Sequence, residues 1–95
     1  MLETIIVLAQ LVGPPPAQYD HPYRGRLTIR EATPEMLQRA CGGTVGPFAI
    51  IFGCAHSHTP QRCTIYLRQG MPADQRAATL RHEIGHCNCH CNWHG

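Results

Sequence analysis

The residues best suited to chemistry lie near the end of the 95-residue sequence, in the segment L-R-H-E-I-G-H-C-N-C-H-C-N-W-H-G. Within it, His82, Glu83 and His86 form the pattern H-E-x-x-H. On a helix, the two histidines are one turn apart and can place both imidazoles on one zinc ion. Glu83 would then reach a zinc-bound water and act as its general base. The spacing predicts a hydrolytic zinc site.

A long helix is predicted to carry these residues, over the segment M-P-A-D-Q-R-A-A-T-L-R-H-E-I-G-H-C-N-C. Pro72 near its start and Asp74 in its first turn favour a helix N-terminus. Five apolar residues follow helical spacing and should form the packed stripe, namely Ala73, Ala77, Leu80, Ile84 and Cys87. The two histidines lie on a different face.

The H-E-I-G-H segment resembles the active-site helix of the zincin metallopeptidases, and the glycine before the second histidine is similar to the metzincin branch. The resemblance covers mainly this helix. It implies a zinc-dependent peptidase in which His82 and His86 are ligands and Glu83 is the base. It also implies that an edge β-strand binds an extended substrate, and we expect that strand to be Phe48–Phe52 or Thr64–Leu67.

The third zinc ligand departs from the metzincin pattern, because Cys89 and Asn92 stand where that family would have glycine and histidine. The segment is also similar to small bacterial metallopeptidases with H-E-I-G-H-C-N-G-W-P-x-x-H. That resemblance implies His94 as the third ligand. His90, Cys89 and Cys91 are the alternatives.

A turn would be needed to bring His94 back, since three histidines on one straight helical face cannot surround one ion. We expect it after Cys87, with Asn88 or Asn92 in the left-handed conformation.

Six cysteines leave several pairings open. Two predicted pairs are Cys54 with Cys63, across a hairpin, and Cys41 with Cys87, between two helices. Cys89 and Cys91 would then stay reduced, pair with another chain, or give a thiolate ligand to the metal.

The upstream sequence predicts the rest of an α+β fold. The segment T-P-E-M-L-Q-R-A-C-G-G reads as a short helix with Thr33 as its N-cap. Phe48–Cys54 and Cys63–Arg68 read as a hairpin joined by a polar loop, A-H-S-H-T-P-Q-R, in which His56 and His58 are expected to be solvated rather than metal-bound. Y-R-G-R-L-T-I-R reads as a half-buried strand with its arginines in solvent.

Two regions are expected along the chain: an apolar segment with a Pro-rich linker at 1–22, and a zincin-like domain at 23–95. The apolar start imitates a secretion signal but lacks its basic residues and its cleavage motif. No stretch is long enough to span a bilayer. The net charge of +2, with arginines dispersed, predicts no nucleic-acid partner. A peptide or protein substrate is what the resemblance to zincin peptidases implies. Paired cysteines would indicate a periplasmic or secreted protein, whereas unpaired cysteines would indicate a cytoplasmic one.

Three functions are compatible with these residues. The first is a minimal zinc peptidase that uses His82, His86 and His94 with Glu83. The second is a structural or metal-storage module in which Cys89 or Cys91 closes the zinc shell, leaving no position for water. The third is a disulfide-stapled binding domain without metal.

Overall fold

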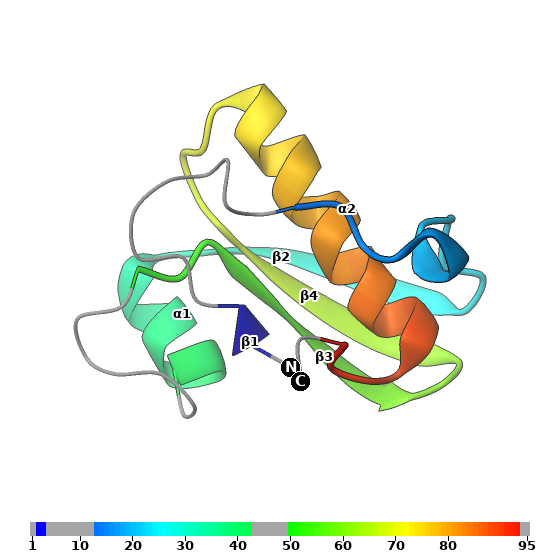
Figure 1. Cartoon of the computed structure of the whole chain (residues 1–95). Helices are drawn as coiled ribbons and strands as arrows, with labels where there is room; N and C mark the ends of the chain where they lie inside the picture. The colour runs from blue at the N-terminus through cyan, green and yellow to red at the C-terminus, as the bar shows by residue number, and fades with distance from the viewer. Residues whose placement is uncertain (1, 4–12, 43–49, 94–95) are drawn as a thin grey trace.

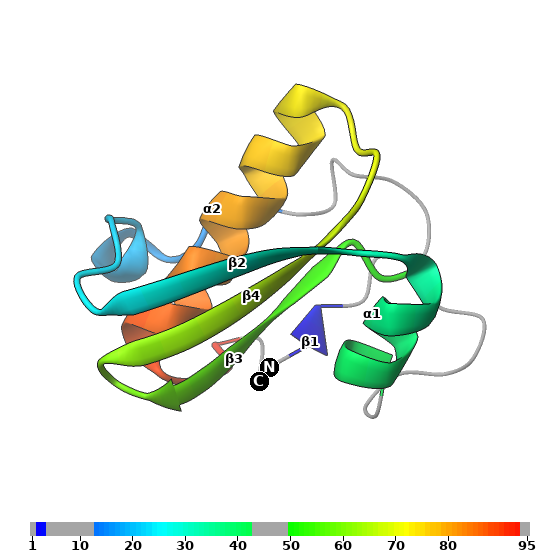
Figure 2. The same cartoon turned by 180° about the vertical axis from the view of Figure 1, so that it is seen from behind.

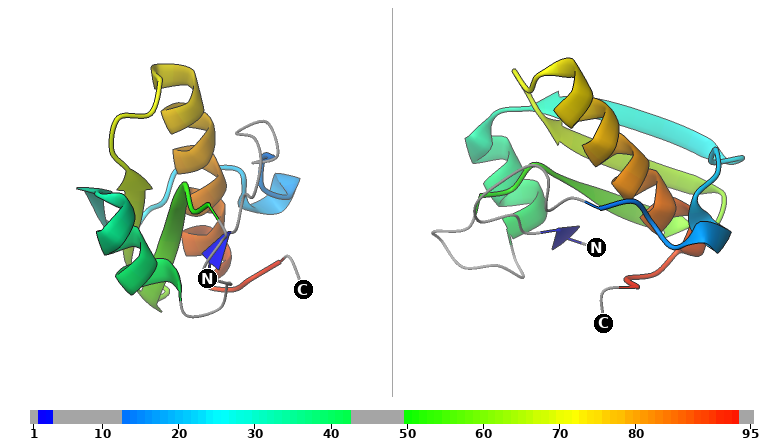
Figure 3. Two further views of the ribbon diagram at one scale, coloured as in Figure 1. Left: turned by 90° about the vertical axis from the view of Figure 1, so that its left-hand side faces the viewer. Right: turned by 45° about the horizontal axis from the view of Figure 1, so that its top comes forward.

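A mixed four-stranded sheet carries one helix on each of its faces (Figures 1 and 3). The computed structural model describes residues 2–3, 13–42 and 50–93. Its elements, in chain order, are β1 (Leu2–Glu3), the 3-10 helix η2 (Ala17–Tyr19), β2 (Arg26–Ala32), α1 (Pro34–Cys41), β3 (Gly53–Thr59), β4 (Arg62–Arg68) and α2 (Ala73–Cys89). The α+β class predicted from the sequence is confirmed.

The strand order in the sheet is β1-β3-β4-β2. β3 and β4 form an antiparallel hairpin, whereas β2 runs parallel to β4 over its whole length. β1 pairs antiparallel with β3 at Gly53 and Cys54. β4 is therefore a central strand, and β2 lies at one edge.

The hairpin differs from the predicted one in where its strands lie. The segment expected to be a polar loop is mostly strand, because β3 extends through Thr59 and leaves only Pro60 and Gln61 between it and β4. Residues 50–52 belong to no strand, and Phe48 lies outside the described residues. A polar strand near the edge of a sheet lacks the continuous apolar run of a buried strand, so its sequence resembles a loop.

The side chains of β4 point alternately to the two faces of the sheet, and the core accordingly consists of two clusters. Cys63, Ile65 and Leu67 are buried against α2 together with Ala55 and Cys87. The other cluster packs α1 against the sheet and contains Ala32, Leu37, Cys41, Ile51 and Cys54. Since neighbouring residues of a strand face opposite sides, Cys54 and Ala55 belong to different clusters.

The short helix α1 follows the predicted cap. Thr33 accepts a hydrogen bond from the backbone N of Met36 at 3.2 Å through its side chain, and Pro34 occupies the first helical position. Gly42 ends the helix. The cap satisfies an N–H that has no partner inside the helix.

The long helix α2 extends two residues beyond the predicted turn after Cys87. It ends at Cys89, and His90 takes the left-handed conformation, with φ 53° and ψ 42°. Among the described residues other than glycine, His90 alone has a positive φ, so neither Asn88 nor Asn92 makes the turn. A disulfide joins Cys89 to Cys91, with their Cα atoms 5.0 Å apart. This link holds the chain in a tight turn at His90.

The predicted apolar stripe of α2 is only partly packed. Ala73 and Ala77 are exposed, whereas Leu80, Ile84 and Cys87 contact the cluster beneath the helix. The fully buried residues are instead largely polar and include Thr79, His82, Glu83 and His86. Burying polar groups is costly unless they are hydrogen-bonded, so this face of α2 is a candidate site.

Candidate metal and catalytic site

His82, Glu83 and His86 lie together in the C-terminal half of α2. The exposed fractions of the three residues are 3%, 0% and 1%. The rings of His82 and His86 are neighbours, with centroids 5.1 Å apart and planes inclined by 70°. The structure thus brings the two predicted imidazoles side by side at a buried position.

Both imidazoles are oriented by backbone carbonyl groups. The Nδ1 atom of His82 lies 2.7 Å from the carbonyl oxygen of Gly13, and that of His86 lies 3.0 Å from the carbonyl oxygen of Cys91. A carbonyl oxygen only accepts, so each Nδ1 must donate a proton. In a neutral imidazole this tautomer leaves the lone pair on Nε2, the arrangement commonly found in metal-binding histidines.

A segment expected to be a linker supplies one of these carbonyl groups. Residues 13–22, here called the strap, lie along α2 (Figure 1). Asn88 donates from Nδ2 to the carbonyl oxygens of Tyr19 and His21, at 2.9 and 2.6 Å. The strap is therefore part of the structure that orients His82, while the proposed domain boundary stays a prediction.

An ion pair fixes the strap one residue before the motif. Arg81 donates two hydrogen bonds to the carboxylate of Asp20. These hydrogen bonds, and to a smaller extent the charge of Arg81, lower the pKa of Asp20 below its usual value. The same carboxylate raises the pKa of Arg81. Both groups are thus charged at neutral pH.

Gly85 lets the strap and Trp93 approach the helix. A Cβ atom at this position would clash with the ring of Pro15 and would lie 2.8 Å from Cη2 of Trp93. The close packing of Pro15 and Trp93 therefore explains why glycine occupies position 85 in this chain, without reference to any family pattern.

The predicted third ligand, His94, lies outside the described residues. The chain leading to it returns over the site, because the Trp93 ring stacks on His86 with centroids 3.7 Å apart and planes inclined by 12°. The same ring lies 5.2 Å from that of His82. His94 stays a prediction, and Trp93 is a site residue that the sequence analysis missed.

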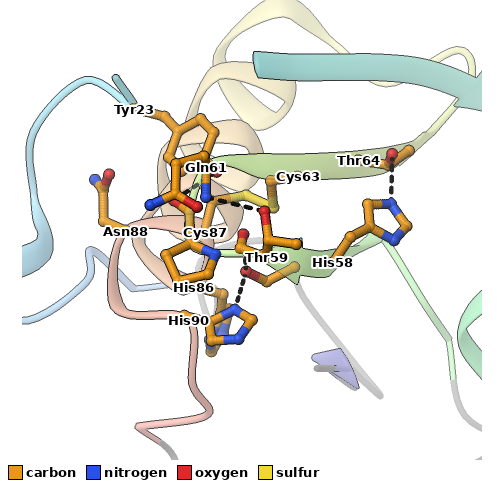
Figure 4. Close-up of a disulfide and its surroundings, with 12 residues drawn as sticks. Tyr23, His58, Thr59, Gln61, Cys63, Thr64, His86, Cys87, Asn88 and His90 are labelled. Atoms are coloured by element: carbon orange, nitrogen blue, oxygen red, sulfur yellow. Dashed lines mark hydrogen bonds between the residues drawn. A yellow bond between two sulfur atoms is a disulfide. The ribbon is translucent and has the colours of Figure 1, made fainter. Parts of the chain in front are cut away.

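The runner-up ligands have other partners in the structure. The Nδ1 atom of His90 is hydrogen-bonded to Oγ of Ser57 on β3. Figure 4 shows His90 in the surroundings of the Cys63–Cys87 disulfide. Cys89 and Cys91 form a disulfide with each other. A disulfide sulfur is not the thiolate that zinc binds, so these cysteines are not zinc ligands in this form of the protein.

A pocket of about 250 Å³ opens between β3 and the end of α2. Its lining consists of Ala55, Ser57, His86, His90, Cys91 and Asn92. One candidate ligand, His86, therefore lies on the wall of a cavity, although its side chain is almost fully buried.

The strand beside this pocket is β3, not either of the two predicted segments. Thr64–Leu67 lies within β4, which has β3 on one side and β2 on the other. In the described residues, no strand pairs with the outer edge of β3 from His56 to Thr59. Such an edge can accept an extended peptide as a further strand.

All six cysteines are paired, as Cys41–Cys54, Cys63–Cys87 and Cys89–Cys91. The predicted pairs Cys54–Cys63 and Cys41–Cys87 are wrong. Cys54 lies opposite Tyr66 in the hairpin register, and Cys63 lies opposite Ser57, so the two cysteines face opposite sides of the sheet. Each long-range disulfide instead ties one helix to the sheet within its own cluster.

A second group of potential ligands lies on the α1 side of the sheet. Ligand atoms of Cys41, Cys54 and His56 are all within 4.8 Å of one another, and this cluster could hold a metal ion. It would do so only with both cysteines as thiolates, which excludes their disulfide. Cys54 and His56 are two residues apart on one strand, and that spacing was the available sequence signal.

Two other side chains on the hairpin, His58 and Tyr66, have structural roles. His58 is hydrogen-bonded to Oγ1 of Thr64 at 3.0 Å (Figure 4). Tyr66 packs against the α1 cluster with its ring 5.3 Å from that of His56. It therefore lies on the face of the sheet opposite to α2.

Comparison of the chain with protein-family models, curated proteins and solved structures finds no significant match in any of the three. Within the described residues, no helix is both long enough and apolar enough to cross a membrane.

Proposed function

We propose that this chain is a zinc-dependent peptidase in which His82 and His86 are metal ligands and Glu83 is the general base. The observation that carries the proposal is the pair of hydrogen bonds from the Nδ1 atoms to the carbonyl oxygens of Gly13 and Cys91. Two neighbouring imidazoles held with Nε2 basic are a donor set that fits zinc. His94 is proposed as the third ligand.

Zinc, when bound, would activate a water molecule and polarise the scissile carbonyl. Glu83 lies between the two ligands in sequence and is held on the same buried stretch of α2. Its carboxylate would take a proton from the attacking water and pass it to the amide nitrogen as the C–N bond breaks. The products are then a free carboxylate and a free amine.

The substrate would lie along the outer edge of β3, since that edge borders the pocket at His86. Backbone hydrogen bonds to a strand hold a peptide extended and give affinity without demanding particular side chains. The pocket wall contributed by Ala55 and Ser57 is made of small residues. We therefore propose a peptide or protein substrate with one side chain in this pocket.

The decisive comparison uses the parent protein, Glu83→Gln, and the exposed control Glu35→Gln. Zinc per chain and cleavage of a mixed peptide library are measured for each. We expect Glu83→Gln to keep its zinc and to lose activity by about 10²-fold or more, the usual contribution of a general base. Glu35→Gln should match the parent in both. A Glu83→Gln protein as active as the parent would contradict the assignment.

The second candidate function is a disulfide-stapled binding domain without metal. The observation that favours it is the pairing of all six cysteines, since small domains often depend on disulfides in place of a large core. A parent protein that takes up no zinc would support this candidate. Zinc uptake without cleavage would support a structural metal site. The disulfides also lead us to propose a periplasmic or secreted location.

A further inference from the structure

The sheet face opposite to α2 carries three exposed arginines. Arg26 and Arg30 on β2 and Arg62 on β4 are exposed. In the register, Arg26 lies opposite Arg62, and Arg30 lies opposite Tyr66. Since Tyr66 packs on the α1 side, all three arginines project from that side of the sheet. Figure 2 shows this face from the front, with α1 covering only one end of it.

Within the described residues, none of these three arginines forms an ion pair. β3 and β4 contain no Asp or Glu. Glu31, the acidic residue of β2, lies one position from Arg30 and pairs with Arg76 of α2 on the other side of the sheet. Arginines without an ion-pair partner on one face produce a positive potential that attracts anions.

The geometry of the face suits a linear polymer. Arg26 and Arg62 lie on neighbouring strands about 5 Å apart, and Arg30 lies about 13 Å further along β2. Thr28 lies between these positions and adds a hydroxyl group, whereas the hydroxyl of Thr64 opposite it is hydrogen-bonded to His58. A guanidinium group forms paired hydrogen bonds with an oxyanion, and hydroxyl groups can bond to sugar hydroxyls.

We propose that this face binds a sulfated polysaccharide. Two features favour a polysaccharide over a nucleic acid. Single-stranded nucleic acids are bound by stacking of bases on exposed aromatic rings, and Tyr66, the aromatic residue of β4, is half-buried and has His56 against its ring. The three disulfides also fit an oxidising compartment outside the cytoplasm, where a glycan is a more accessible polyanion than a nucleic acid. The proposal does not depend on the peptidase site, which lies on the α2 side.

The test compares Arg26→Gln/Arg62→Gln with Arg76→Gln/Arg81→Gln, a control that removes the same charge from the α2 side. Binding of a heparin oligosaccharide is measured by calorimetry at 0.15 M salt, with a single-stranded oligonucleotide as the second ligand. Thermal unfolding verifies that both variants are folded.

We expect the parent to bind heparin, and the face variant to bind it about 20-fold more weakly. This estimate borrows the counter-ion release of nucleic acids, about 0.8 per contact, which at 0.15 M salt gives a factor of about four to five for each lost contact. The control should change affinity by less than about threefold, because its charges lie elsewhere. Equal losses in the two variants, no binding by the parent, or tighter binding of the oligonucleotide would each overturn the proposal.

Discussion

The disulfide Cys63–Cys87 is predicted to be the largest covalent contribution to stability, because it closes the longest loop and ties α2 to the centre of the sheet. The two cysteines are 24 positions apart. Restricting the unfolded chain with a loop of this length stabilises the fold by about 3.5 kcal/mol at 25 °C. Both residues are buried, with exposed fractions of 0% and 1%. Removing their sulfur atoms should therefore add a cavity cost of about 1 kcal/mol.

The perturbation is Cys63→Ala/Cys87→Ala. We expect the free energy of unfolding to fall by about 4 to 5 kcal/mol, and the melting temperature by about 20 °C for a chain of this size. Circular dichroism in heat and in urea, without reductant, measures both quantities. The matched control is Cys89→Ala/Cys91→Ala, whose cysteines are only two positions apart. By the same loop-entropy estimate, the Cys89–Cys91 disulfide stabilises the fold by only about 1.6 kcal/mol.

Two results would refute this reasoning. One is a control that destabilises the protein as much as Cys63→Ala/Cys87→Ala does, since loop length would then not govern the effect. The other is peptide mapping under non-reducing conditions that finds Cys54 joined to Cys63. That pairing would contradict the register in which Cys54 lies opposite Tyr66.

Two further predictions concern the strap. Gly85→Ala should destabilise the protein by up to about 2 kcal/mol in urea unfolding, because overpacking against Pro15 and Trp93 costs about 1 to 3 kcal/mol while the gain in helix propensity recovers about 1 kcal/mol. A more stable variant would show that the strap moves away without cost. Asp20→Asn should reduce the loss of stability in acid. The hydrogen bonds from Arg81 lower the pKa of Asp20 in the folded state, so their contribution is present above the unfolded pKa and is lost as the pH falls through the folded value. Urea unfolding from pH 7 to pH 2 measures this difference, and identical pH profiles for parent and variant would contradict it.

The sequence alone was sufficient for features that depend on local spacing. The 3.6-residue period of a helix places His82 and His86 one turn apart, whatever the surrounding fold. Thr33 and Pro34 likewise determine the start of α1, because capping involves only backbone groups within one turn. The α+β class followed from these local elements.

Only the tertiary structure decided which distant residues meet. The disulfide pairs depend on strand register, and a shift of one residue moves a cysteine to the other face of the sheet. The Gly13 carbonyl that orients His82 comes from a Pro-rich segment that has no regular period and looks like a linker in sequence. The turn at His90 lies between two cysteines that are joined by a disulfide, a pairing that their spacing in sequence does not specify. Local spacing therefore specified the candidate ligands, and long-range packing decided how they are held.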